Sequence, residues 1–343
     1  MPYNTAIAYI QSLCAIPSPT GFTKDAENFV FTTLQEMGFS PWKTPKGTVL
    51  CSLGGQTHPL LLSCHIDTLG AMVRSIKPTG RLRYTQIGGY NVGSIENENC
   101  LVHTRQGKTF SGTFQHTNAS RHVYGSTDTI NRTDETLEVV LDELVSSEDD
   151  VKHLGIRPGD YISFDPRTLY TSSGYLKSRH LDDKASAGIL LSIADLVAKK
   201  ELLLSRNITL MFTVFEEIGH GASPAFSLPV EDMIAVDMGC VGDDLSCKET
   251  MVSICAKDSS GPYHYDLTNE LISLAENEGI DYAVDIYPRY ASDASAAMEA
   301  GLDVRHALIG PGVFASHGYE RTHRLGIENT LNLLKAYISL PKK

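Results

Sequence analysis

The sequence lacks several features that would assign it to a class of protein directly. No segment reaches 18 uninterrupted apolar residues, so we expect no membrane-spanning helix. Lys and Arg number 29 against 41 Asp and Glu, and the net charge of −12 argues against nucleic acid or an anionic membrane as a partner. The seven cysteines are odd in number and include no C-x-x-C pair, which argues against a disulfide framework and a zinc knuckle.

Signals for export and for several enzyme classes are also missing. Residues 1–5 show neither the basic region nor the apolar run of a signal peptide, so we expect a cytoplasmic protein. The sequence contains no H-E-x-x-H, no G-x-S-x-G, no G-x-x-x-x-G-K-[ST] and no dinucleotide-binding glycine fingerprint. The sequence therefore carries none of these signatures of other enzyme classes.

The hydrophobic pattern that is present predicts an α/β chain. With 343 residues, of which 42% are hydrophobic, the chain is long enough to bury a sizeable core. Apolar periodicity and capping signals predict helices over 5–15, 23–38, 183–199, 263–278, 293–300 and 327–338. Apolar runs predict strands at 48–53, 60–64, 208–215, 233–237 and 282–287.

The stretch from about 72 to 166 has a different texture. Turn residues separate short strand-like runs near 72–76, 82–87, 101–104, 110–115, 137–141 and 161–164, a pattern typical of a small β-barrel or sandwich. The acidic run 148–150 is expected to be a solvated loop.

The simplest domain organisation is one α/β domain interrupted by a β-rich insert. We assign residues 1–71 and 167–343 to the α/β domain and residues 72–166 to the insert. Two domains in series are the alternative, but that arrangement would leave the first 70 residues with too small a core.

The first candidate site residues follow the apolar run 60–64. His65 and Asp67 stand two residues apart on an extended segment, so their side chains point to the same side. A histidine at a strand end could bind a metal, and Asp67 could orient its imidazole. Taken alone, such a pair more often has a structural role.

Acidic residues recur at the ends of other predicted elements. Asp182 and Asp183 precede a long helix, where they could bind cations or cap that helix. Glu216 and Glu217 end one apolar strand, and Asp237 ends the next. In a pair of this kind one carboxylate could bind a metal while the other transfers protons. Each feature alone has an ordinary explanation as a cap, a charged strand end or a turn.

A late loop that contains His317 and His323 completes the set. Histidine and carboxylate ligands together form a mixed nitrogen and oxygen donor set suited to zinc, cobalt or manganese. Because every candidate lies at or just beyond the end of a predicted element, one fold can bring them together. Coincidence therefore becomes the weaker explanation.

The order of these motifs resembles the glutamyl/leucyl (tetrahedral-type) aminopeptidases, a family of cytosolic metallopeptidases with two cocatalytic metal ions. The resemblance covers nearly the whole chain, including a β-rich insert between the first histidine and the Asp-Asp pair. It implies a three-layer α/β/α catalytic domain with a mixed central sheet and a β-barrel-like insert that serves dimerisation and assembly. It also implies a homo-oligomer built from dimers, up to a dodecamer.

The resemblance implies two divalent metal ions per subunit, zinc or cobalt first and manganese as a third option. The implied ligands are His65, Asp182, Glu217, Asp237 and His323. Asp182 would bridge the ions, with His65 and Asp237 on one of them and Glu217 and His323 on the other.

The resemblance also implies the catalytic roles. Glu216 would be the general base that takes a proton from the attacking water and passes it to the leaving amine, and Asp67 would orient His65. The expected reaction is removal of the N-terminal residue from a short peptide.

Two departures from the family pattern affect these expectations. The turn at 218–222 is one residue shorter than usual, which alters the adjoining substrate pocket. The late histidine is not followed by Ser-Pro, and His317 competes with His323 as the ligand. We favour His323 because residues 319–322 resemble those that lead into the family's ligand.

Alternatives remain at this stage. His180 and His220 are either substrate contacts or ordinary polar loop residues. A deacylase or carboxypeptidase that acts on N-acyl amino acids would use a similar metal site, and a binding or assembly protein could retain the fold without catalysis.

Overall fold

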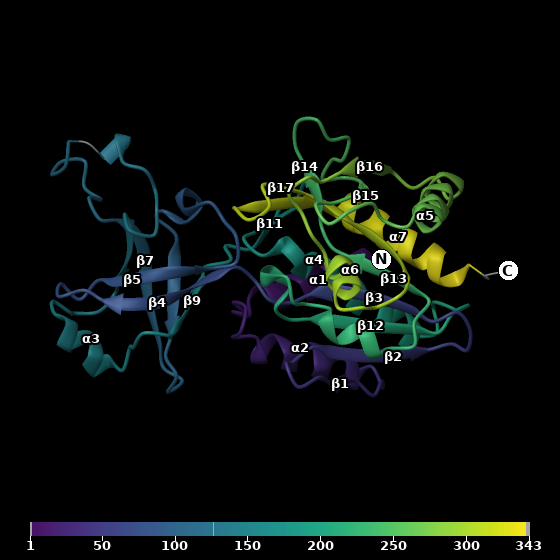
Figure 1. Cartoon of the computed structure of the whole chain (residues 1–343), viewed down its shortest axis with the longest axis horizontal. Helices are drawn as coiled ribbons and strands as arrows, with labels where there is room; N and C mark the ends of the chain where they lie inside the picture. Colours follow the sequence, from purple (N-terminus) through teal and green to yellow (C-terminus); the bar gives the residue numbers. More distant parts are fainter. Residues whose placement is uncertain (1, 126, 341–343) are drawn as a thin grey trace. The chain divides into compact units, whose positions relative to one another are not determined.

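The computed structural model describes residues 2–125 and 127–340, which form two compact units. Met1–Asp67 and Arg167–Lys343 build the larger unit, and Thr68–Pro166 build the smaller one. Figure 1 labels their elements. Among the described residues, every helix is too short or too polar to cross a bilayer.

The larger unit contains a mixed sheet of twelve strands. Along its main path the strands are β1 (Trp42–Lys43), β2 (Val49–Gly54), β12 (Ile208–Thr213), β3 (Leu60–His65), β13 (Asp232–Val236), β17 (Arg305–Phe314), β18 (Glu320–His323), β11 (Tyr175–Ser178) and β10 (Leu169–Tyr170). Three strands lie off this path: β14 (Gly239–Val241) and β15 (Val252–Lys257) pair with β17, and β16 (Tyr282–Ile286) pairs with β15. Neighbours β12, β3, β13 and β17 run parallel, so their carboxyl ends share one edge of the sheet.

Helices cover both faces of this sheet. On one face lie α1 (Pro2–Cys14), α2 (Lys24–Glu36), α4 (Leu181–Ala198), α5 (Tyr265–Asn277) and α7 (Arg324–Ser339). On the other lie α6 (Asp293–Glu299) and a short turn at Ser223–Ser227. Alternate residues of β3 supply both cores, since Leu60 and Leu62 pack with the first group and Leu61 with the second. The predicted three-layer α/β/α fold is therefore confirmed.

The smaller unit is a closed barrel whose strands follow the order β4-β5-β8-β7-β6-β9. Their bounds are β4 (Gly70–Ile76), β5 (Leu82–Ile87), β6 (Asn99–His103), β7 (Thr109–His116), β8 (Leu137–Leu141) and β9 (Tyr161–Phe164). Buried aliphatic and aromatic side chains fill the interior, with Phe114 in contact with both Tyr84 and Phe164. The barrel-like architecture expected for the insert is also confirmed.

The prediction of a solvated loop at 148–150 is wrong. These residues begin α3 (Glu148–Leu154), whose N-terminus carries a capping box. The Ser147 hydroxyl accepts from the Asp150 amide at 3.2 Å, and Asp150 accepts from the Ser147 amide at 3.0 Å. The acidic residues of the first turn complement the helix dipole, so the charge run stabilises a helix.

The strand β17 was not predicted, because its sequence resembles that of a turn. Gly310, Pro311 and Gly312 lie in its middle and are typical of a turn. A Cβ atom on Gly310 would collide with the main-chain carbonyl of Asp237, so this position requires glycine. The close approach brings the end of β13 against β17.

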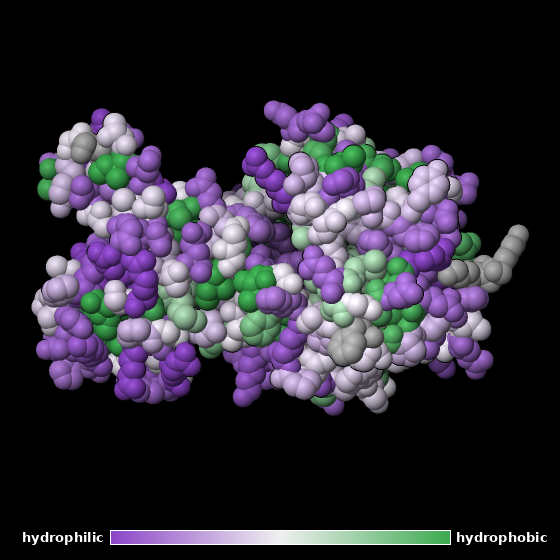
Figure 2. Space-filling view, in the orientation of Figure 1, coloured by the Kyte–Doolittle hydropathy of each residue, from purple (hydrophilic) through white to green (hydrophobic). Residues whose placement is uncertain are grey.

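The surface is mainly hydrophilic on the face drawn in Figure 2, where hydrophobic residues form several separate groups. Strongly exposed hydrophobic residues occur in both units, among them Val123, Leu144, Leu203 and Tyr265. Scattered residues of this kind do not by themselves indicate a binding surface.

Candidate metal centre

Most of the candidate residues lie close together at the ends of the four parallel strands β12, β3, β13 and β17. His65 is the last residue of β3, and Glu216 and Glu217 lie in the turn that follows β12. Asp237 follows β13, and His317 lies in the turn after β17. Since these strands are neighbours, residues far apart in the sequence meet at their carboxyl ends.

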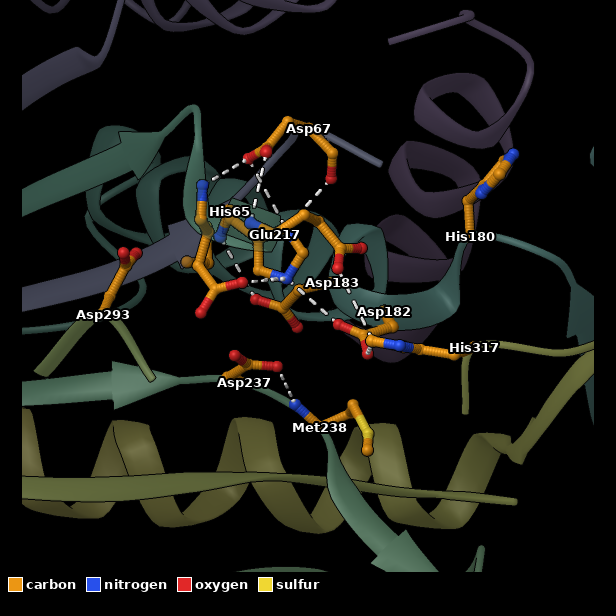
Figure 3. Close-up of polar contacts among 12 residues, drawn as sticks. His65, Asp67, His180, Asp182, Asp183, Glu217, Asp237, Met238, Asp293 and His317 are labelled. Atoms are coloured by element: carbon orange, nitrogen blue, oxygen red, sulfur yellow. Dashed lines mark hydrogen bonds and ion pairs between the residues drawn. The ribbon is translucent and has the colours of Figure 1, made fainter. Parts of the chain in front are cut away.

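Asp182 comes from the start of α4 and lies between two histidines (Figure 3). Its Oδ1 atom is 3.0 Å from Nε2 of His65, and its Oδ2 atom is 3.3 Å from Nε2 of His317. The same His317 nitrogen is 3.5 Å from Oε2 of Glu217. The two oxygens of one carboxylate therefore face two separate groups of donor atoms.

His65 is held so that one ring nitrogen remains directed at the carboxylates. Its Nδ1 donates a hydrogen bond of 2.9 Å to the main-chain carbonyl of Asp67. A carbonyl oxygen only accepts, so Nδ1 carries the hydrogen and Nε2 is the nitrogen that can bind a metal. The ligand atoms of His65, Asp182 and Asp237 lie within 4.8 Å of one another, and all three residues are buried.

The carboxylate of Asp67, which was expected to orient His65, makes its hydrogen bonds to other groups. It lies 3.7 Å from Nδ1 of His65, whereas it accepts hydrogen bonds from the Thr20 hydroxyl at 2.7 Å and from the amides of Glu216 at 3.2 Å and Glu217 at 3.4 Å. Asp67 therefore orients His65 through its main chain, and its side chain fixes the turn that carries both glutamates.

His323 does not join the cluster. Its Nε2 donates to the main-chain carbonyl of Ser173 at 3.0 Å, and its Nδ1 accepts from the Leu325 amide at 3.2 Å as the N-cap of α7. The reason is the antiparallel pairing of β18 with β11, because β11 runs toward Asp182 and β18 runs away from it. The structure therefore places His317, and not the favoured His323, in contact with Asp182.

The remaining candidates lie outside the group of donor atoms. The Oδ2 atom of Asp183 accepts from the His65 amide at 3.3 Å and so supports the end of β3. The ring of His180 points away from the carboxylates in Figure 3. Neither His180 nor His220 is among the described residues that line the cavity over the cluster.

This cavity has a volume of about 400 Å³. Its floor is formed by Asp182, Glu216, Glu217, Asp237 and His317. Its wall includes Ser260, Arg289, Tyr290, Ser292, Ser295 and Glu299. The cluster is therefore accessible to a small ligand.

Sequence reasoning missed two residues that support the cluster. Glu320 is completely buried in β18 and accepts hydrogen bonds from the amides of Asp182 and His317. Tyr290 donates to the Met238 carbonyl at 3.0 Å, beside Asp237. The only sequence signal for Glu320 is its place between the two late histidines, and Tyr290 has none.

Burial and mutual repulsion perturb the acidic groups. Burial, followed by the charge of Asp182, raises the pKa of Glu217 to about 8 and that of Asp237 to about 7. Burial also raises the pKa of Glu216 well above its usual value. Burial opposes ionisation of Asp182 as well, but His317 and His65 lower its pKa.

The donors fit a metal centre. Burial alone would lower the pKa of His65, yet Glu216, Asp182 and Asp237 raise it well above its usual value, which indicates a strongly negative environment. Among the described residues, the buried Oε1 atom of Glu217 has no hydrogen-bond partner. A divalent cation would satisfy this oxygen and compensate the clustered charges.

The fold and the donor set together fit a protein that binds a divalent metal. A profile of the M42 glutamyl aminopeptidase family matches residues 47–333. The Bacillus subtilis protein YhfE, named as an aminopeptidase, is 44% identical over 334 residues, which are 97% of this chain and 96% of YhfE. The chain therefore belongs to the M42 glutamyl aminopeptidase family and is an aminopeptidase, a hydrolase that acts on peptides.

Solved structures agree with this family at the level of the fold. The TET1 peptidase of Pyrococcus horikoshii is 22% identical, with a TM-score of 0.84 and coverage of 97% of this chain and 99% of its own. A TET aminopeptidase from a marine sediment archaeon of the Thaumarchaeota is 16% identical, with a TM-score of 0.89 and coverage of 98% and 96%. The predictions of family and enzyme class are confirmed, and membership of this metallopeptidase family implies a divalent metal.

Proposed function

We propose that this aminopeptidase binds two divalent metal ions that share Asp182. His65 and Asp237 would complete one site, and Glu217 and His317 would complete the other. The observation that supports this proposal is the orientation of Asp182, whose Oδ1 faces His65 at 3.0 Å and whose Oδ2 faces His317 at 3.3 Å. We propose zinc or cobalt as the ions, with manganese as a third option, because the donor set mixes imidazole and carboxylate groups.

Two bound cations would polarise the scissile carbonyl, lower the pKa of the attacking water and stabilise negative charge on the carbonyl oxygen. Glu216 is the proposed general base. It lines the cavity, and its Oε2 atom is 3.7 Å from Nε2 of His65, next to the proposed ligands. Its carboxylate takes a proton from the attacking water and passes it to the amine of the leaving peptide.

The acidic floor of the cavity supports cleavage at the N-terminal bond. A free α-ammonium group carries a positive charge and donates hydrogen bonds, so it complements the carboxylates of Glu216, Glu217 and Asp237. An N-acylated substrate lacks this charge. The cavity of about 400 Å³ has room for a terminal side chain rather than for a folded segment.

We also propose a homo-oligomer, in which the insert makes contacts between subunits. The similar TET1 peptidase of P. horikoshii assembles into a tetrahedron or a large octahedral shell, which supports this proposal by analogy. The cytoplasm is the proposed location, since all seven cysteines are free thiols, as is usual in a reducing compartment. Native mass spectrometry of the purified chain tests the assembly, and a monomer at micromolar concentration would contradict it.

An assay with matched substrates tests the activity. The enzyme is made metal-free with a chelator and reloaded with zinc, cobalt or manganese. It is then mixed with aminoacyl p-nitroanilides and their N-acetylated counterparts. We expect turnover of the free-amine substrates only, lost on chelation and restored by metal. Turnover of the N-acetylated series would indicate a deacylase, and no turnover with any metal would overturn the proposed site.

A further inference from the structure

One buried carboxylate joins two parts of the proposed second metal site. Glu320 is 0% exposed, and its Oε2 atom accepts from the amide of Asp182 at 2.9 Å. Its Oε1 atom accepts from the amide of His317, also at 2.9 Å. The main chains that carry the shared aspartate and the late histidine are therefore tied to the same side chain.

Both amides need such an acceptor. Asp182 and Asp183 have non-helical backbone angles, so the hydrogen bonds of α4 do not hold Asp182 in place. The loop that carries His317 is strained, since Ala315 and His317 have φ values of 60° and 61°, a region unfavourable for residues with a Cβ atom. A buried N–H group without an acceptor is also unfavourable, and Glu320 removes that cost at both positions.

We propose that Glu320 is a positioning residue that fixes the distance between Asp182 and His317 and thereby maintains the affinity of the second metal site. Glu320 is not among the described residues that line the cavity, so it acts through the ligands and not on the substrate. This inference rests on the proposed function, in which Asp182 and His317 bind metal. It extends that function, because Glu320 was not among the expected ligands.

The variant Glu320→Gln isolates this effect. Glutamine has nearly the same shape, but its NH₂ group would face one of the two amides, so one hydrogen bond is lost. The second site should lose more affinity than the first, because His65 and Asp237 remain in place. We expect a 10- to 100-fold weaker second binding step, roughly the usual effect of removing a group that supports a metal ligand.

A cobalt titration of the whole chain, made metal-free with a chelator, measures the affinity of each binding step. Visible absorption and calorimetry follow each Co²⁺ ion that binds to the wild type and the variant. Asp285→Asn is the matched control, since the buried Asp285 carboxylate accepts from the amides of Ser246 at 2.8 Å and Cys247 at 2.9 Å. These residues are not among the described residues that line the cavity, so the control should bind cobalt as the wild type does.

The outcomes separate this inference from the proposed function. Wild type that fails to bind two cobalt ions overturns the two-metal site itself. Wild type that binds two ions, together with Glu320→Gln that binds both unchanged, overturns only the role of Glu320. Equally weakened cobalt binding in Glu320→Gln and Asp285→Asn also overturns the role of Glu320, because loss of any buried carboxylate would then have the same effect. If Glu320→Gln does not fold, Glu320→Asp replaces it, since the shorter carboxylate cannot reach both amides.

Discussion

At the residue scale, the properties of the centre follow from one ionised aspartate among buried acids. Asp182 keeps a low pKa because two histidines contact it, and its charge adds to the effect of burial on Glu217 and Asp237. Such a cluster cannot hold all of its negative charge without cations. The same arrangement that makes the metal-free site unfavourable therefore supports the proposed binding of two divalent ions.

Glu216→Gln should separate metal binding from catalysis. Glutamine cannot accept the proton from the attacking water, so we expect kcat to fall by about 10²- to 10⁴-fold while the metal content is unchanged. Steady-state kinetics and elemental analysis measure the two quantities. Glu299→Gln is the control, since Glu299 is an exposed glutamate in the wall of the same cavity, and its kcat should stay within a few-fold of wild type. Unchanged kcat in Glu216→Gln would refute its role as the base.

The two late histidines should respond in opposite ways. His317→Ala should lose one metal ion and most activity, because His317 contacts Asp182 and Glu217. His323→Ala should keep both ions and lose about 1 kcal/mol of stability, because it removes the N-cap of α7. Metal content and thermal unfolding measure this contrast, and loss of metal in His323→Ala alone would restore the original assignment.

Most of the clustered residues could be found from the sequence because their carboxylate and imidazole side chains stand at the ends of recognisable elements. His65, Glu217 and Asp237 each follow an apolar strand that could be recognised, and Asp182 precedes a long helix. The choice between His317 and His323 depends on which way β18 runs beside β11, and strand pairing of this kind leaves no local signal. Glu320 was missed for the same reason, because the amides that its carboxylate accepts from belong to other segments of the chain.

At the scale of elements, the short turn after β12 controls the relation between Glu216 and Glu217. The turn begins after Phe215, which has a φ of 69°, and it ends at Gly219. The carboxylate of Asp67 accepts from both glutamate amides and so holds the turn against the end of β3. The proposed catalytic geometry therefore depends on the side chain of Asp67, which is not itself a proposed metal ligand.

Asp67→Asn should reduce turnover more than metal affinity. Asparagine keeps the main-chain carbonyl that orients His65 but offers only one side-chain acceptor to the turn. We expect kcat to fall by about 10- to 100-fold, with little change at the site of His65 and Asp237. Kinetics and metal titration of the same sample decide this. A loss of metal at the first site with normal kcat in the remaining enzyme would contradict the role given to Asp67.

Many elements with a clear hydrophobic pattern were predicted, and several elements that depend on tertiary contacts were not. The helix α4 and the strand β3 have nearly continuous apolar runs, and both appear where expected. The strand β17 was missed because Gly310 to Gly312 resemble a turn, although the glycine at 310 serves the close approach of Asp237. The helix α3 was missed because its capping acids resemble a solvated loop.

At the scale of the whole molecule, the cluster should make stability depend on pH when the metal is removed. The pKa values of Glu217, about 8, and Asp237, about 7, lie above those of the unfolded chain. Between about pH 4.5 and pH 8 the folded state therefore binds more protons, and the free energy of unfolding falls as pH rises.

Thermal unfolding of the chelated protein measures this dependence. We expect Tm to fall by about 3 °C or more between pH 5.5 and pH 8, and we expect zinc-loaded protein to lack most of this decrease because the cations compensate the charges. Asp237→Asn is the control, since it removes one titrating group and should flatten the profile of the metal-free protein. A metal-free Tm that rises over this range would contradict the charge assignment.

The most direct test of the shared aspartate is the zinc stoichiometry of Asp182→Asn, determined by native mass spectrometry beside the wild type. The neutral amide keeps the shape of the side chain but is a poor bridge between two cations, so both ions should be lost or strongly weakened together, against two per subunit in the wild type. Retention of two ions per subunit, or loss of one with the other bound normally, would contradict the bridging role of Asp182.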